Sequence, residues 1–298
     1  MDALTLDQIQ IFLTVVDEGS FSKAAKKLNR AQSAVTYGIQ KLEAQFDVPL
    51  FDRTAYRPAL TEAGRTLLLR ARRIAEEANA FRDTARSLAS GLEAELTIVL
   101  DSMFPMPPVA KALKAFTEKF PTVPPRIYVQ PLGAAAELVL EGACMIGLLP
   151  LIFSDIAVFK RFPLLTIDLV PVVALGHPLS EIEGPIETYV LHQHVQLVLT
   201  DRSALTAGRD YGVLSGRTWR LADLSAKHSM LLAGLGWGNM PAHMVEEDIG
   251  RGRLKVIQPV EFDPRVAQLV MGGAYLADRH LGPAGSWMIR HLSGAFVS

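Results

Sequence analysis

The segment from Ser20 to Leu50 constrains the fold of this 298-residue chain most, because it contains two short amphipathic patterns separated by a turn. The first pattern has the i, i+3, i+4 and i+7 spacing of one helical face and consists of Phe21, Ala24, Ala25 and Leu28. The apolar stripe of the second consists of Val35, Ile39, Leu42 and Phe46. The spacing therefore predicts a helix-turn-helix over residues 21–40.

The outward face of the second predicted helix carries almost only hydrogen-bonding side chains, namely Gln32, Ser33, Thr36, Tyr37 and Gln40. Glutamine can pair with the N6 and N7 edge of adenine, while serine, threonine and tyrosine can contact bases or phosphates. Such a face suits the major groove of double-stranded DNA. Because helix pairs with a solvated polar face are also common, this pattern alone leaves both interpretations open.

Three strings around the two helices favour the DNA-binding interpretation. They are SFSKAA (Ser20–Ala25), VPLFDR (Val48–Arg53) and LTEAG (Leu60–Gly64), and the last two flank a short basic loop. Together they resemble the DNA-binding domain of the LysR-type transcriptional regulators. The resemblance implies a winged helix-turn-helix over residues 1–60, with DNA contacts from Lys23, Gln32, Ser33, Thr36, Tyr37, Gln40, Arg53 and Arg57.

Two features depart from the family pattern. The recognition helix begins after Ala31 rather than after a serine, so it lacks a side-chain cap, which stabilises a helix start by about 1 kcal/mol. Residues 1–60 also contain seven Lys or Arg and seven Asp or Glu, so this region has no basic excess. Affinity for DNA must therefore come from the positions of the cations, which cluster around the motif.

A long heptad pattern follows the DNA-binding segment. Its apolar positions alternate four and three apart and are Leu67, Ala71, Ile74, Ala78, Phe81, Ala85 and Leu88. Thr61 is the expected N-cap of this helix and Gly91 its expected stop, which gives a linker helix over residues 61–91. We expect the stripe to join copies of the chain in a homodimer or homotetramer, as the resemblance also implies. The alternative is a helix packed on its own domain.

From residue 92 to 298 the pattern changes to alternating strands and helices, which predicts an α/β module with a mainly parallel sheet. Strands are expected at 95–100, 126–130, 144–150, 195–200, 237–240 and 266–275, and helices at about 109–120, 134–140, 223–233 and from 283. The resemblance implies an effector-binding domain of two subdomains, similar to periplasmic binding proteins. We expect subdomain I at about 92–163 and 267–298, and subdomain II at about 164–266.

Ligands of open α/β sheets bind at the carboxyl ends of the strands, and helix N-termini favour anionic groups. This rule selects, as candidate effector-binding residues, Asp101, Ser102, Met103, Leu132, Gly133, Thr200, Ser203 and Lys227. Each could equally be an ordinary loop residue or a solvated charge. Asp101 is unusual for a site that, in this family, commonly recognises carboxylates, and it suggests a small organic effector that also carries a hydroxyl or an amine.

Composition excludes several other classes of protein. The single cysteine, Cys144, excludes a disulfide within one chain, a thiolate zinc site and the two-cysteine peroxide switch of one branch of this family. The net charge of −1 gives no general attraction to nucleic acid or membrane. An apolar N-terminal signal and a long uncharged apolar run are both absent, so we expect a cytoplasmic protein without a membrane partner.

The sequence contains no G-x-S-x-G elbow, P-loop or H-E-x-x-H helix, so we expect neither an enzyme nor a cofactor. His192 and His194 could share one face of a strand, but no acidic or cysteine residue nearby completes a metal site, and we expect no metal. The sequence thus predicts a sequence-specific transcriptional regulator of bacterial type, controlled by a small-molecule effector, with RNA polymerase as a candidate partner. The alternative is a small-molecule sensor that acts mainly through protein contacts and binds DNA non-specifically.

Overall fold

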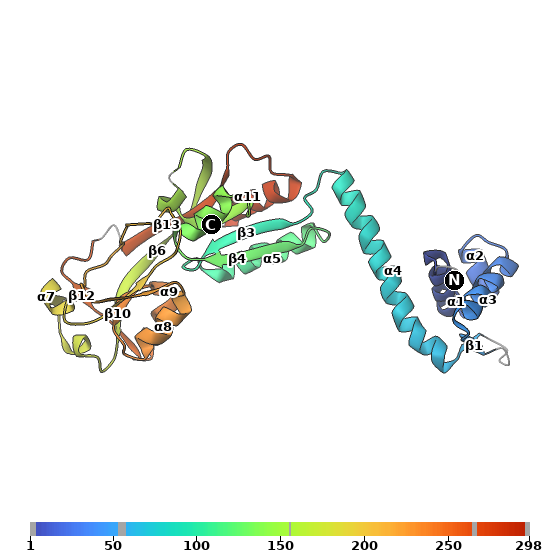
Figure 1. Cartoon of the computed structure of the whole chain (residues 1–298), viewed down its shortest axis with the longest axis horizontal. Helices are drawn as coiled ribbons and strands as arrows, with labels where there is room; N and C mark the ends of the chain where they lie inside the picture. Colours follow the sequence, from blue (N-terminus) through green and yellow to red (C-terminus); the bar gives the residue numbers. More distant parts are fainter. Residues whose placement is uncertain (1–3, 53–57, 155, 264–266, 296–298) are drawn as a thin grey trace. The chain divides into compact units, whose positions relative to one another are not determined.

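The computed structural model describes residues 4–52, 58–154, 156–263 and 267–295. The chain divides into two compact units, Met1–Ser90 and Gly91–Ser298 (Figure 1). Each unit has its own hydrophobic core. Among the described residues, no helix is both long enough and apolar enough to cross a membrane.

Unit 1 is helical apart from a two-stranded hairpin. Its elements are α1 (Leu6–Glu18), α2 (Phe21–Lys27), α3 (Gln32–Phe46), β1 (Phe51–Asp52), β2 (Ala59–Leu60) and α4 (Glu62–Ala89). Side-chain caps start three of the helices, with Thr5 before α1, Ser20 before α2 and Thr61 before α4. The fourth, α3, begins after Ala31 without a side-chain cap, as predicted.

The core of unit 1 joins the first three helices to the hairpin. The Phe12 and Phe51 rings meet edge to face with their centroids 5.8 Å apart. Glu43 is buried and accepts hydrogen bonds from the backbone N of Leu50 (2.7 Å) and of Phe51 (3.2 Å), which fixes the start of the hairpin against α3. Phe46, the last residue of α3, is 49% exposed, so the prediction of a buried stripe was wrong at this residue.

Unit 2 contains a nine-stranded mixed sheet. In sheet order its strands are β4 (Pro125–Gln130), β3 (Leu96–Asp101), β5 (Ile146–Pro150), β13 (Gln268–Leu276), β6 (Phe159–Ala174), β10 (Trp237–Pro241), β8 (Gln196–Leu199) and β9 (Thr218–Leu221), and β11 (Leu254–Val256) also pairs with β6. The longer helices are α5 (Met106–Lys119), α6 (Gly133–Leu140), α8 (Leu224–Leu232), α9 (Ala242–Gly250) and α11 (Pro283–Ala295). The shorter elements are η1 (Leu151–Ser154), η2 (Pro178–Glu181), α7 (Thr188–Leu191), β7 (Pro185–Ile186) and β12 (Gln258–Pro259).

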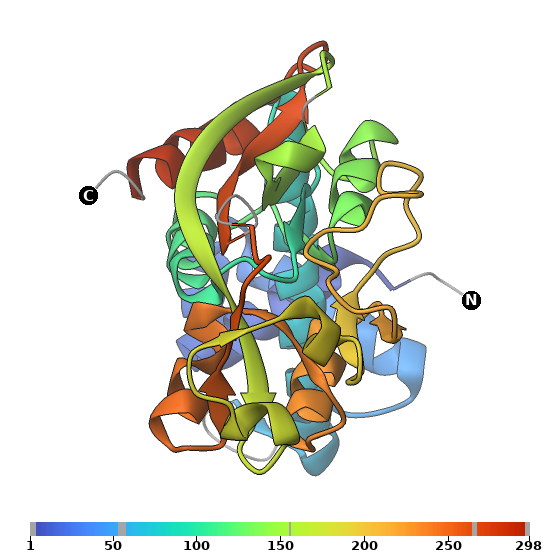
Figure 2. The ribbon, with the colours of Figure 1, turned by 90° about the vertical axis from the view of Figure 1, so that its left-hand side faces the viewer.

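The strand β6 divides unit 2 into two halves. Its residues 159–168 pair with β13, and its residues 169–174 pair with β10 and β11. Figure 2 shows β6 as one continuous curved ribbon, coloured yellow-green, that passes from one half to the other. We call half I the part with β3, β4, β5 and β13, and half II the part with β8, β9, β10 and β11.

Strand directions follow this division. The strands β4, β3 and β5 are parallel to one another, and so are β10, β8 and β9. The strands β6 and β13 run antiparallel to their neighbours. The predicted fold class, a winged helix-turn-helix followed by a two-part α/β module, is confirmed.

Candidate nucleic-acid interface and ligand cavity

The outward face of α3 gathers most of the predicted DNA-contacting side chains. Gln32, Ser33, Tyr37 and Gln40 are exposed and lie around one shallow hollow, and Tyr37 is 66% exposed. Thr36 borders the same hollow and is half-exposed, and its Oγ1 donates to the carbonyl of Gln32 (3.0 Å). This arrangement presents donors and acceptors of several kinds to a groove-sized partner.

The basic side chains near α3 fall into two groups. Lys27 pairs with Glu18 (2.6 Å), and Arg30 binds the carboxylate of Asp7 through both terminal nitrogens (2.7 and 2.8 Å), so these two cations support the fold. Lys23 is exposed, and in the described part of unit 1 no ion pair neutralises it. The predicted wing contacts, Arg53 and Arg57, lie outside the described residues.

The predicted dimerisation stripe of α4 does not form one uniform surface. Ala71 is buried in the core of unit 1, where Leu68 and Ala75 pack beside it, so this part of the helix is attached to its own unit. Phe81 is 77% exposed and Leu88 is 49% exposed. The other stripe residues range from half-buried to exposed and are Leu67, Ile74, Ala78 and Ala85. Exposed apolar side chains thus occur along α4, and the most exposed residue of the stripe is Phe81, in the half of the helix remote from the core.

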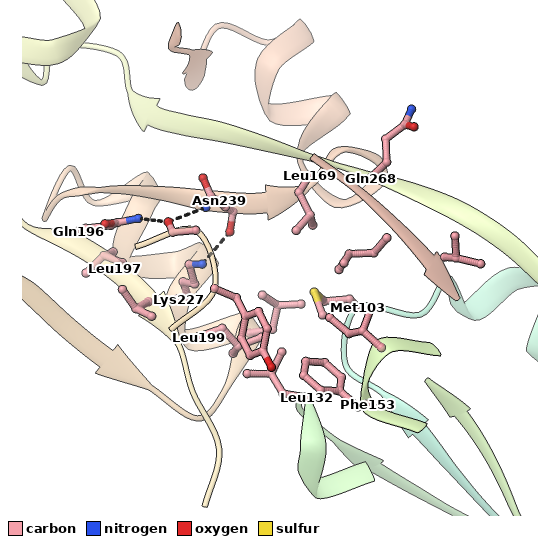
Figure 3. Close-up of a pocket in the computed structure, with 17 residues that line it drawn as sticks. Met103, Leu132, Phe153, Leu169, Gln196, Leu197, Leu199, Lys227, Asn239 and Gln268 are labelled. Carbon is pink, nitrogen blue, oxygen red and sulfur yellow. Dashed lines mark hydrogen bonds between the residues drawn. The ribbon is translucent and has the colours of Figure 1, made fainter. Parts of the chain in front are cut away.

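A cavity of about 290 Å³ lies between the two halves of unit 2 (Figure 3). Half I and β6 contribute Met103, Leu132, Ile152, Phe153, Leu169, Gln268, Leu269 and Val270. Half II contributes Gln196, Leu197, Val198, Leu199, Tyr211, Gly212, Leu224, Lys227 and Asn239. The rings of Phe153 and Tyr211 meet edge to face across the junction, with centroids 5.4 Å apart. A concave, largely apolar site with a few polar groups is typical of small-molecule binding.

Two amides at the polar end of the cavity shape its wall. Gln196 donates from Nε2 to the carbonyl of Gly212 (2.7 Å), and its Oε1 accepts from the backbone N of Leu214 and Ser215. Asn239 also donates to the Gly212 carbonyl, at 3.1 Å. These bonds hold the segment at Gly212 against β8 and β10. The Oδ1 of Asn239 is buried and has no hydrogen-bond partner among the described residues.

Lys227 is the cation of this polar end. It is 3% exposed, and its Nζ donates to the backbone carbonyl of Asn239 (2.6 Å). Burial lowers the pKa of Lys227 to about 7, because the charged form loses its hydration. Gly238 leaves room for the Lys227 side chain, because it has no side chain of its own. A Cβ at Gly238 would lie 3.2 Å from Cε of Lys227 and 2.5 Å from the carbonyl oxygen of Leu197.

The carboxyl group of Asp101 accepts hydrogen bonds from the backbone near the end of β3. Asp101 is 1% exposed and accepts hydrogen bonds from the backbone N of Met103 (2.8 Å) and of Leu132 (2.6 Å). Leu132 adopts a positive φ of 53°, which an L-residue adopts only when its surroundings favour it, and the bond from Asp101 is one such constraint. Burial raises the pKa of Asp101 to about 7. Asp101 does not line the cavity, and the neighbouring Ser102 also lies outside it.

Thr200 and Ser203 line a second, more polar hollow of about 420 Å³, which shares Leu132 with the cavity. Asp201, beside them, accepts from the backbone N of Ala134 (2.7 Å) and from the Thr206 hydroxyl. A carboxylate of half II therefore caps α6 of half I. Gly133 permits this approach, because a Cβ there would lie 2.8 Å from Cγ2 of Thr206.

The two histidines considered as metal ligands do not share a strand face. His192 caps the C-terminal end of α7, and the ring of His194 packs on His177 with centroids 4.9 Å apart. In the described ranges, no cluster of three or more His, Cys, Asp or Glu is arranged to bind a metal ion. The Cys144 thiol is buried, which raises its pKa to about 11 and leaves it almost entirely protonated at neutral pH.

Comparison with known proteins identifies the family. Residues 6–65 match "Bacterial regulatory helix-turn-helix protein, lysR family", and residues 89–296 match "LysR substrate binding domain". The chain belongs to the LysR family. This LysR-family chain is 33% identical over 301 residues to "Probable HTH-type transcriptional regulator YhaJ" of Escherichia coli K12, covering 99% of the chain and 97% of that relative. It is 28% identical to "HTH-type transcriptional regulator AceR" of Acinetobacter baumannii, with coverage of 96% and 95%.

Two solved structures share the fold of this chain. The C206 mutant of OxyR from Corynebacterium glutamicum aligns with a TM-score of 0.56 at 23% identity, covering 99% of this chain and 94% of that chain. CrgA from Neisseria meningitidis aligns with a TM-score of 0.51 at 21% identity, covering 99% of each chain. Since its relatives are transcriptional regulators, this LysR-family chain is a DNA-binding transcriptional regulator with an effector-binding domain, not an enzyme.

The candidate effector residues of this LysR-family regulator separate into three places. Met103, Leu132 and Lys227 line the cavity, whereas Thr200 and Ser203, with Leu132, line the second hollow. Asp101, Ser102 and Gly133 line neither. Sequence reasoning missed the aromatic pair and the two wall amides, which are Phe153, Tyr211, Gln196 and Asn239. Only Gln196 and Asn239 carried a usable signal, since polar residues inside buried strand patterns need partners.

Proposed function

We propose that this chain is a sequence-specific transcriptional regulator whose action on DNA is controlled by a small organic effector bound in the cavity of unit 2. The observation that carries the proposal is the composition of the cavity walls, because both halves contribute to them. A ligand in this place contacts both halves at once. It therefore stabilises the arrangement of the halves that it fits best, by as much as its affinity differs between arrangements.

DNA recognition in this proposal belongs to the outward face of α3. Replacing Gln32 with Ala removes a side chain able to pair with adenine, so it should weaken binding to a selected DNA site by about 1 to 3 kcal/mol. Binding to random DNA should hardly change. The measurement is a titration of both DNAs at fixed salt, and Gln10→Ala on α1 is the matched control. Equal losses on both DNAs would instead support the alternative of non-specific binding.

Control by the effector is tested by filling the cavity. Leu199→Trp places a large ring in it from half II, so DNA binding without effector should persist while the response to effectors is lost. Leu175→Trp is the matched control, because Leu175 is 62% exposed and lies outside the cavity. The readout is a screen of metabolites for changes in DNA affinity of the full chain. A response that survives in Leu199→Trp would place the effector elsewhere.

Self-association completes the proposal, since we expect a homodimer or homotetramer. Two exposed apolar surfaces support self-association. The first is the exposed apolar end of α4, with Phe81 and Leu88. The second is the edge strand β4, where Ile127, Tyr128 and Val129 are 40%, 38% and 55% exposed. An exposed apolar edge strand is a template for pairing with another chain, so its occupation by a second copy would remove that exposure.

A further inference from the structure

Residues 200–212 connect β8 to β9 in half II as a series of turns and irregular backbone. We call this segment the lid, because Tyr211 and Gly212 form part of the cavity wall. The start of the lid is fixed to half II, since the backbone N of Thr200 donates to the carbonyl of Leu221 at the end of β9 (2.8 Å). Figure 2 shows the lid as a gold loop that extends from half II to the green helix α6 of half I.

The other end of the lid is fixed to half II by two amides. The Gly212 carbonyl accepts from Nε2 of Gln196 and from Nδ2 of Asn239, as the dashed lines in Figure 3 mark. The Oδ1 of the same Asn239 amide is buried and has no partner among the described residues. A buried acceptor without a partner is unfavourable, so contacts elsewhere along the lid must offset this cost.

Half I holds the lid between its two ends. The Asp201 carboxylate accepts from the backbone N of Ala134 at the start of α6 (2.7 Å), and the backbone N of Ala204 donates to Oε1 of Glu137 on the same helix (3.4 Å). Leu205 packs against the apolar cluster that joins α6 to β3 and β5. Two hydrogen bonds of opposite direction and one apolar contact therefore attach the lid to half I.

The turn at the start of the lid directs the Asp201 carboxylate at α6. The hydroxyl of Thr206 donates to Oδ1 of Asp201, and Oγ of Ser203 accepts from the backbone N of Leu205 (2.9 Å). Oδ2 of Asp201 is thereby placed at the N-terminal end of the helix, where the helix dipole favours a negative charge. A hydrogen bond from a backbone N–H to a carboxylate is stronger than one between neutral groups, so Asp201 is the main polar attachment of the lid.

We infer that residues 200–212 form a lid that the Asp201 carboxylate latches onto the N-terminus of α6, and that this latch holds the two halves together and controls access to the cavity. A molecule enters past Tyr211 and Gly212 only after the latch opens. The inference rests on the proposed function in one respect, since the cavity is taken to be the ligand site. The latch itself is a contact within the protein and is tested without a ligand.

Hydrogen exchange of the full-length chain, without added compounds, measures the opening of the latch. In the wild type, the backbone amides of residues 133–137 and 201–206 should exchange much more slowly than those of an unstructured peptide. Asp201→Ala removes the acceptor of Ala134 N and should speed exchange in both segments about tenfold.

Asp210→Ala is the matched control for the loss of a carboxylate. Asp210 also belongs to the lid, but it forms an exposed ion pair with Arg220 of its own half (2.6 Å). Because exposed ion pairs contribute little to stability, Asp210→Ala should keep the wild-type exchange rates.

Gly133→Ala should open the latch from the opposite half. A Cβ at Gly133 would lie 2.8 Å from Cγ2 of Thr206 and 2.9 Å from Oγ of Ser203, whereas α6 itself tolerates alanine because the φ of Gly133 is not positive. Exchange of residues 201–206 should again be about tenfold faster. Gly250→Ala is the matched control, since no atom lies within 4 Å of a Cβ built there.

Exchange of residues 201–206 at the rate of an unstructured peptide in the wild type would overturn the inference, and this measurement needs no variant to fold. Unchanged exchange in both Asp201→Ala and Gly133→Ala would also overturn it. The proposed function is read separately, from the response of DNA affinity to metabolites in the wild type and in Leu199→Trp. If the latch behaves as expected and no compound acts through the cavity, the inference about the latch stands and the proposed function fails. If compounds act through the cavity and the lid is unprotected, the proposed function stands and the latch is refuted.

Discussion

Asp101 and Lys227 are both buried in unit 2, and burial moves their pKa values toward neutrality from opposite sides. The pKa of Asp101 is raised to about 7 and that of Lys227 is lowered to about 7. Both shifts arise because the charged form loses hydration. The two residues differ in their partners, since Asp101 accepts two backbone hydrogen bonds, whereas Lys227 has one carbonyl acceptor. Asp101 therefore contributes to the local fold, and Lys227 is available to a ligand.

Replacing Asp101 with Asn should destabilise unit 2 in a pH-dependent way. Asn has one acceptor oxygen, so its NH2 group would face one of the two backbone N–H groups that Asp101 accepts from, and that N–H would lose its acceptor, which costs about 1 to 3 kcal/mol. Because the folded pKa lies above the unfolded value, the stability that Asp101 supplies is present at acid pH and is lost as pH rises toward 7. Urea unfolding should show the deficit of Asp101→Asn largest below about pH 4 and shrinking between about pH 4 and 7. The exposed Asp83→Asn should show no such trend, and a deficit that grows with pH would contradict the assignment.

Replacing Lys227 with Met should have the opposite effect on stability. The folded pKa of Lys227 lies below the unfolded value, so the unfolded chain binds more protons between about pH 7 and 10, and wild-type stability rises across that window. Lys227→Met removes a buried, unpaired cation and should stabilise unit 2 by about 1 to 4 kcal/mol near neutral pH. The gain should shrink toward pH 10. Urea unfolding at two pH values measures it, and a loss of stability at pH 7 would show that the lysine has a partner.

At the scale of elements, α4 combines two roles along one helix. Its first half is fixed to unit 1 through Ala71, whereas Phe81 and Leu88 remain exposed near its end. Phe81→Glu with Leu88→Glu should therefore break the proposed dimer and leave unit 1 folded, because neither residue belongs to the core. Ala71→Glu should unfold unit 1, since it buries a charge. Sedimentation and circular dichroism separate these outcomes, with Arg73→Glu as an exposed control. A wild-type mass for the double variant would refute self-association through α4.

The sequence predicts where helices and strands lie along the chain better than it predicts which elements pack against one another. The period of the apolar residues located α5, and buried runs located β3 and β5, because those signals are local. Thr61 as N-cap and Gly91 as stop predicted the bounds of α4 closely, but the heptad pattern could not show that Ala71 packs into its own unit. The exposure of β4 was equally hidden, because it depends on sheet order, in which β4 lies at the edge beside β3.

The candidate site was less predictable than the fold for a related reason. The rule for strand ends selected Met103, Leu132 and Lys227, which do line the cavity. It also selected Asp101, whose carboxylate bonds to nearby backbone instead. Tyr211 lies in an irregular segment without periodicity, and only the meeting of the two halves brings its ring to Phe153. Contacts made by residues far apart in sequence leave no local pattern.

At the scale of the whole molecule, separate cores predict separate unfolding. Val35 is fully buried in unit 1 and Leu96 in unit 2, and each belongs to its own cluster. Calorimetry of the full chain should show two transitions. Leu96→Ala should lower only the unit 2 transition, by about 2 to 5 kcal/mol of stability. Val35→Ala should lower only the unit 1 transition. A single transition that both variants shift together would show that the units unfold as one.

The continuity of β6 limits how the effector-binding unit can respond. Its 16 residues pair with β13 in half I and with β10 in half II, with one register shift between Met271 and Gly272 of β13. A wide swing of one half about this strand would break the hydrogen bonds of this pairing, so it is disfavoured. A change in the twist of β6 keeps these hydrogen bonds, because sheets accommodate different degrees of twist. The connection between the two halves is therefore stiff. We expect ligand binding in the cavity to cause a small rotation of the two halves relative to each other, rather than the wide opening and closing of a flexible hinge.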